Sequence, residues 1–114
     1  MSHYEETKVS FEFLFPLLSP GGIYVIEDWS WAHHLNYQSP DAPRSKRRAL
    51  SNLLFEQIML LGSTSLISEI RVWRFLYLIH KAKSAVRMSD IPQKVESGSI
   101  FDQILSRGRT WDLI

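Results

Sequence analysis

The sequence contains no cysteine, which excludes disulfide bonds and thiolate metal sites and fits a reducing compartment. No apolar run approaches the roughly 20 residues that a membrane-spanning helix needs. The first six residues are polar and acidic, unlike a signal peptide. The formal net charge is only +1 at pH 7, so we expect no global attraction to nucleic acid or to an acidic membrane. These absences lead us to expect a cytoplasmic protein with neither of these partners.

The composition is that of an ordinary globular chain, with 114 residues of which 45% are hydrophobic. This length allows one domain with a modest core. We place that domain in residues 1–82, because regular apolar patterns fade beyond them. Residues 83–114 read as a tail, in which we expect a short helix over 100–105 and a docking contact from Trp111.

The most informative stretch runs from residue 4 to residue 28. Apolar residues at Phe11, Leu14, Phe15 and Leu18 have the spacing of an amphipathic helix. Pro16 should distort the last turn of that helix, and the Ser-Pro-Gly-Gly sequence of residues 19–22 should end it. Residues 23–26 are apolar at every position, which is typical of a strand covered on both faces, as in parallel sheets.

The strand is followed by two adjacent carboxylates, Glu27 and Asp28. Ligands of open α/β sheets bind beyond the carboxyl ends of the strands, so this pair is a candidate site. The other interpretation is a helix cap or a solvated turn.

The remainder predicts a long loop, a helix and two strands. Residues 29–43 are irregular and aromatic, and residues 44–61 return to helical spacing, with Gly62 ending the helix. We expect the helix to bury Leu50, Leu53, Leu54, Ile58 and Leu61. Residues 66–73 and 75–81 read as strands around a reversal near Arg74, with Leu66, Ile70 and Val72 on one side of the first and Glu69 and Arg71 on the other. Only one strand is of the parallel type, so either the hairpin pairs with it or a neighbouring strand is lacking.

Several segments resemble a known family. Phe11, Leu14, Phe15 and Pro16 match a Phe-x-x-Leu-Phe-Pro helix, and residues 20–28 match a Pro-Gly-Gly-x-Tyr-x-Ile-Glu-Asp strand. Ser2 and His3 match the end of an Asp-Asp-Gly/Ala-Ser-His motif, with Met1 in place of its small residue. Together these motifs resemble those of a bacterial small-molecule O-methyltransferase-like group of the class I S-adenosylmethionine-dependent methyltransferases. The likeness is specific over residues 2–33, looser to residue 82 and absent beyond.

The resemblance implies an α/β fold: the C-terminal portion of a Rossmann-like methyltransferase sheet, with helix, parallel strand, helix and antiparallel edge hairpin, and without the N-terminal strands. The implied activity is methyl transfer from S-adenosylmethionine to the hydroxyl of a small molecule, assisted by Mg²⁺. The resemblance makes His3 the catalytic base and Glu27 and Asp28 the metal ligands. The upstream Asp ligand and the glycine-rich cofactor loop have no counterpart in the sequence, so no cofactor-binding residue is assigned and the chain alone is expected to be inactive.

Other interpretations of these residues stay open. Trp29, Trp31 and Tyr37 are candidates for the wall of a substrate pocket or for core packing. His33 and His34 with Asp41 suggest a metal site less than a surface loop, and the basic residues 44–48 suggest mostly a solvated helix face. The alternative function is a non-catalytic interaction module, or a remnant of the fold that self-associates through an open sheet edge.

Overall fold

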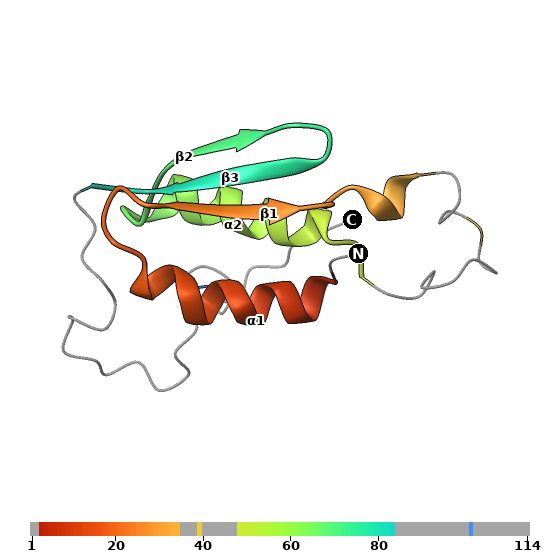
Figure 1. Ribbon diagram of the computed structural model, residues 1–114, viewed down its shortest axis with the longest axis horizontal. Coiled ribbons are helices and arrows are strands. Elements are labelled where there is room, and N and C mark those ends of the chain that lie inside the picture. The colour runs from red at the N-terminus through yellow and green to blue at the C-terminus, as the bar shows by residue number, and fades with distance from the viewer. Residues whose placement is uncertain (1–2, 35–38, 40–47, 84–100, 102–114) are drawn as a thin grey trace.

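The computed structural model describes residues 3–34, 39, 48–83 and 101 (Figure 1). In chain order these residues form two α-helices, two short 3-10 helices and three strands: α1 (Tyr4–Leu14), η1 (Phe15–Leu17), β1 (Ile23–Glu27), η2 (Trp31–His33), α2 (Ser51–Ser63), β2 (Ile67–Val72) and β3 (Leu76–Lys81). The chain is therefore of the α/β class, as predicted. Among the residues described, no helix combines the length and the apolar character needed to cross a membrane.

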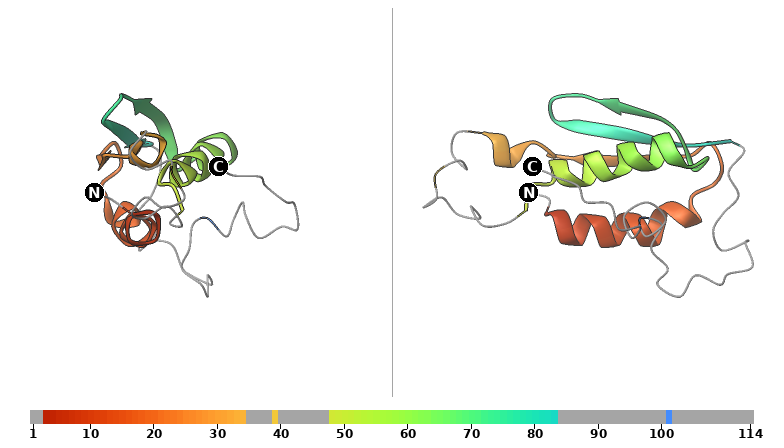
Figure 2. Two further views of the ribbon diagram at one scale, coloured as in Figure 1. Left: turned by 90° about the vertical axis from the view of Figure 1, so that its right-hand side faces the viewer. Right: turned by 180° about the vertical axis from the view of Figure 1, so that it is seen from behind.

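The three strands form one sheet in the order β1-β3-β2, and both pairings are antiparallel. The hairpin therefore pairs with β1, which is one of the two arrangements that the sequence left open. The expectation of a parallel strand at residues 23–26 is wrong for the described residues, because β1 pairs with the antiparallel β3 alone. Because β3 runs opposite to both neighbours, β1 and β2 run in the same direction, and α2 makes the connection between them. Figure 1 and the reverse view in Figure 2 show α2 covering one face of the sheet, while α1 runs beside β1 on the side away from β3.

The prediction that β1 is covered on both faces is wrong for the part of the chain that the structure describes. Ile26 is buried and Tyr24 packs against the core, but Ile23 is 48% exposed and Val25 is 47% exposed. The strand alternates because helices cover only one face of the sheet (Figure 2).

The first helix is shorter than predicted, because Pro16 changes its last turn into η1. Phe11 and Phe15 enter the core as expected, with ring centroids 4.7 Å apart. Leu14, which the helical spacing also assigned to the core, is 48% exposed. The buried ring of Phe101 lies 5.8 Å from that of Phe11, so at least this residue of the predicted tail belongs to the core. The predicted helix over 100–105 otherwise lies outside the described residues, as does Trp111.

The second helix begins at Ser51 and not in the predicted basic segment, since the described residues 48–50 are not helical. It differs from its prediction at three further points. Gly62 does not end α2, which continues to Ser63, and Thr64 caps Leu60 through both its backbone N–H and its hydroxyl. Ile58 is 44% exposed, whereas Leu60 is buried. Leu50, Leu53 and Leu54 are buried as predicted, and Leu61 packs against the core.

Polar side chains occupy the part of the α2 core face that apolar spacing did not predict. Glu56 accepts a hydrogen bond from Tyr4 and lies 3.0 Å from the ammonium of Lys8. Gln57 accepts a 2.6 Å hydrogen bond from Tyr77. Tyr4 and Lys8 provide partners for the Glu56 carboxylate where water cannot reach it, which makes its burial tolerable. Gln57 is satisfied at its Oε1 only, since its Nε2 is buried without a hydrogen-bond partner among the residues described.

The alternation predicted for the first hairpin strand is partly wrong. A register shift between Ile67 and Glu69 interrupts β2, and Ile67 becomes the buried residue. Ile70 and Leu66 pack against the core, but Val72 is 48% exposed. An irregularity of this kind displaces every following side chain relative to a strict period of two.

Candidate functional site at the carboxyl end of β1

The candidate site begins where β1 ends, at an unusual backbone conformation. Asp28 has φ of +54°, the left-handed region that Asp tolerates better than most residues. Its backbone N–H donates a 2.7 Å hydrogen bond to the carbonyl of Phe75. This bond holds the chain in the turn that follows the strand, so the position of the Glu27-Asp28 pair is fixed by the neighbouring hairpin.

The loop after Asp28 is tied to the same hairpin. The indole N–H of Trp29 donates to the carbonyl of Trp73 at 2.8 Å, and the hydroxyl of Ser30 donates to that of Arg74 at 3.2 Å. The β2–β3 turn therefore supports the loop that follows β1. The sequence indicated a reversal near Arg74, but nothing in its pattern showed that this turn would support the loop after β1.

His3 and Trp31 are brought together from the two sides of the predicted site. Their rings meet edge to face, with centroids 6.2 Å apart. His3 directly precedes α1, and its Nδ1 is buried without a hydrogen-bond partner among the residues described. Trp31, in η2, is only 2% exposed. It therefore supports the histidine ring and offers little surface to a substrate.

Trp29, the other predicted wall residue, packs partly against the core, where its ring meets that of Tyr77 edge to face at 6.3 Å. These contacts agree with the packing alternative. Tyr37, the third predicted wall residue, lies outside the described residues.

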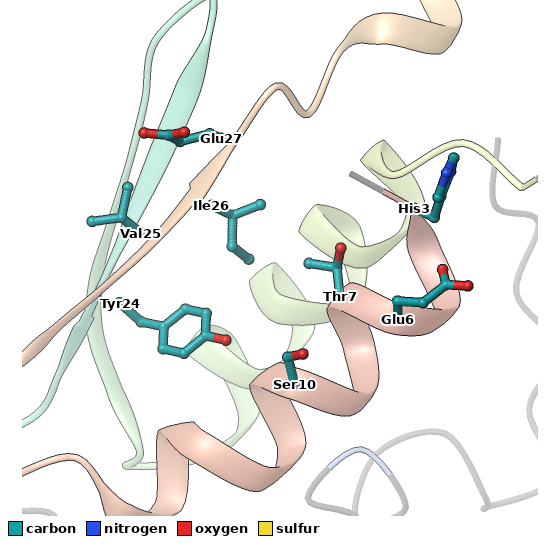
Figure 3. A pocket seen from close by; sticks show the side chains of 8 residues that line it. All are labelled: His3, Glu6, Thr7, Ser10, Tyr24, Val25, Ile26 and Glu27. Atoms are coloured by element: carbon teal, nitrogen blue, oxygen red, sulfur yellow. The ribbon is translucent and has the colours of Figure 1, made fainter. Parts of the chain in front are cut away.

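A groove of about 460 Å³ runs between α1 and β1 (Figure 3). It joins His3 to the end of β1, but it does not bring the predicted base and metal ligand face to face. Figure 3 shows the Glu27 carboxylate pointing away from α1, with the His3 ring at the far end of the helix. The lining residues come from the start of the chain and from β1: His3, Glu6, Thr7, Ser10, Tyr24, Val25, Ile26 and Glu27.

The described residues contain no group of three or more His, Cys, Asp or Glu side chains that is placed to hold a metal ion. Glu27 and Asp28 would provide at most two carboxylates. His33 and His34 do not converge, because His33 lies 2.8 Å from the hydroxyl of Ser51 and His34 lies 3.4 Å from that of Ser30. Asp41 and residues 44–47 of the basic cluster lie outside the described residues.

The Gly21-Gly22 pair serves the turn and not a ligand. Gly21 has φ of +83°, and a Cβ on Gly22 would lie 2.6 Å from Cγ of Leu18. Gly21 therefore needs glycine for its backbone conformation, and Gly22 needs it because a side chain there would collide with Leu18.

Comparison with protein-family models, curated proteins and solved structures gives no match for this chain.

Proposed function

We propose that this chain forms the acceptor side of a methyltransferase site of the class I S-adenosylmethionine-dependent type, for methyl transfer to the hydroxyl of a small molecule. The resemblance of residues 2–33 to that family supports the proposal. The observation that carries it is that His3 and the carboxyl end of β1 line one groove, with Trp31 against the histidine ring. This shared groove supports a role for His3 toward an acceptor bound there.

In this site His3 acts as the general base. A neutral imidazole accepts the proton of the acceptor hydroxyl, and general-base assistance of this kind typically accelerates a reaction about 10²- to 10⁴-fold. The edge contact with Trp31 restricts the orientation of the ring. S-Adenosylmethionine would supply the methyl group. The sequence has no counterpart of the family's glycine-rich cofactor loop, so we assign this chain no part in holding the donor and expect no turnover by the chain alone.

Glu27 and Asp28 would bind Mg²⁺ only weakly. Magnesium is commonly held by one or two carboxylates, with water in the remaining positions, and two carboxylates are what this site offers. Because Asp28 leaves the extended conformation, the alternation of the strand does not hold these two side chains on opposite faces. When bound, the ion would orient the acceptor oxygen and lower its pKa.

The metal site is tested on the chain itself by nuclear magnetic resonance with Mn²⁺ as a paramagnetic substitute. Substoichiometric Mn²⁺ should broaden the amide signals of Glu27 and Asp28, and millimolar MgCl₂ should restore them. The Asp28→Asn variant should lose the effect, whereas Glu5→Gln, which removes an exposed carboxylate from the first turn of α1, should keep it. Uniform broadening, or none at these amides, would refute the proposed metal site.

The base is tested separately by following the ring protons of His3 while a phenol, as a small hydroxyl acceptor, is titrated into the same sample. The proposal requires selective shifts at His3 and at the Trp31 indole. If neither His3 nor Trp31 shows a shift, the proposal that this chain forms the acceptor side is refuted. S-Adenosylhomocysteine should leave the spectrum unchanged, and shifts caused by it would contradict the statement that the chain lacks a cofactor cradle.

A further inference from the structure

The edge of β1 that faces away from β3 carries its own hydrogen-bonding groups. Asp28 donates to Phe75, and Gly22 accepts from Lys81, so the even-numbered residues of β1 direct their backbone groups toward β3. In an antiparallel pair these directions alternate along the strand. Ile23, Val25 and Glu27 therefore direct their N–H and C=O groups to the opposite edge, with which no strand of the described structure pairs.

This edge borders the groove between β1 and α1. On the α1 side the groove is lined by Glu6, Thr7 and Ser10, none of which is large and apolar. Figure 3 shows Thr7 and Ser10 on the side of α1 toward β1, whereas the Glu6 carboxylate points toward His3. The groove thus combines a free strand edge with a helix wall, which is the arrangement in which extended peptides are bound by strand addition.

The walls of the groove favour a single strand over a second copy of the chain. Two copies that pair antiparallel through β1 are related by a two-fold axis perpendicular to the joined sheet. The axis places the α1 helices of both copies on the same face of that sheet, beside the two paired β1 strands. That space already holds the α1 of the first copy, which lines the groove. An isolated extended segment brings no such helix.

The side chains beside the edge define what such a segment must present. Ile23 and Val25 are about half exposed and are suited to β-branched or other apolar neighbours on an added strand. Glu27 follows them at the end of β1 and is exposed, and Glu6 lies on the helix wall. No Lys or Arg lines the groove among the residues described. The carboxyl end of the groove therefore suits a cation.

We propose that the groove along the free edge of β1 binds an extended peptide segment as an added antiparallel strand. The segment places Lys or Arg opposite Glu27 and apolar residues opposite Val25 and Ile23, in the order basic-x-apolar-x-apolar. This binding function shares the groove and Glu27 with the proposed acceptor site. Its test is nevertheless separate from that of methyl transfer, because peptide binding uses the backbone edge and Glu27 and requires neither His3 nor a metal.

The test uses the full chain, labelled with ¹⁵N, and two synthetic peptides: acetyl-Thr-Lys-Thr-Val-Thr-Ile-Thr-amide and the same peptide with Glu in place of Lys. The Lys peptide should shift the amide signals of Ile23, Val25 and Glu27 and slow their hydrogen exchange. We expect it to bind about fivefold more tightly than the Glu peptide, from the usual size of cross-strand charge pairs. Methylation of the peptide nitrogens that face β1 should abolish binding.

Charge reversal provides the matched control. Glu27→Lys should reverse the preference between the two peptides, whereas Glu5→Lys, an equal charge change at an exposed site on α1, should preserve it. Well-dispersed spectra of both variants establish that they are folded. The proposal is overturned if neither peptide shifts these amides at millimolar concentration, if the shifts appear at the β2–β3 turn instead, or if the free chain is already a dimer with these three amides protected.

Discussion

Replacing Lys81 by Met should destabilise the protein much more than the same replacement of Lys83. Lys81 is 1% exposed. Its ammonium donates to the carbonyls of Phe15, Pro16 and Leu18 at 3.2, 3.1 and 2.7 Å. These carbonyls end α1 and η1, where helical hydrogen bonding stops. The lysine therefore caps the distorted helix end that Pro16 creates.

The magnitude follows from two opposing terms. Three hydrogen bonds from a charged donor contribute on the order of 6 kcal/mol. The wild-type protein, unlike the variant, must also bury an ammonium group, and this burial costs several kcal/mol and offsets part of the gain. We therefore expect Lys81→Met to lower the free energy of unfolding by about 3 kcal/mol, since Met fills a similar volume but leaves the carbonyls without this donor.

Urea unfolding followed by tryptophan fluorescence measures this loss. With a slope of about 1–3 kcal/mol per M for a small protein, the midpoint should fall by about 1–3 M. Lys83→Met is the matched control, because Lys83 is exposed two residues further on, and it should change the midpoint little. If the two variants unfold within about 0.5 kcal/mol of each other, the cap does not stabilise the fold as we reason.

Two further predictions concern the turn and the core. Gly22→Ala should destabilise by about 1–3 kcal/mol, because its Cβ would lie 2.6 Å from Leu18. In contrast, Gly62→Ala, with open space around it inside α2, should stabilise by about 0.5–1 kcal/mol; equal effects in thermal melts would contradict this reasoning. Burial raises the pKa of Tyr77 above the ordinary value of 10.0. The unfolded chain therefore releases this proton first as the pH rises above about 10, and stability should fall by up to about 1.4 kcal/mol per pH unit for this group. Tyr77→Phe should be less stable at pH 7, where it loses the bond to Gln57, yet its stability should decline less steeply between pH 10 and 11. A parallel decline of both proteins in urea titrations at these pH values would refute this assignment.

The sequence was informative where the cause of structure is local. The helix before residue 18, the Pro-Gly-Gly turn, the strand ending at Glu27 and the hairpin around Arg74 all follow from periodicity and from turn residues, which act over a few positions. The same local signals place Glu27 and Asp28 at the end of a strand. They do not show which way the two carboxylates point.

The candidate site was accessible to sequence reasoning only in part. The resemblance selected His3, the strand end selected Glu27, and Trp31 was selected as an aromatic residue of the following loop. The structure places His3 against Trp31 but turns Glu27 away from α1. The supporting turn at Trp73 and Arg74 was not predicted. Its contribution is made by backbone carbonyls, which every residue possesses and which no residue pattern reveals.

The sequence by itself determined the order and kind of the elements, because helix period, strand character and turn chemistry are properties of neighbouring residues. Only the tertiary structure decided which polar side chains are buried and which apolar side chains stay exposed. Glu56 and Lys81 lie in the interior because Tyr4, Lys8 and the carbonyls ending η1 reach them from distant parts of the chain, while Leu14 and Ile58 remain exposed although their spacing is apolar. Burial depends on which surfaces meet, and the free energy of a polar group in the core depends on a partner that lies far away in sequence.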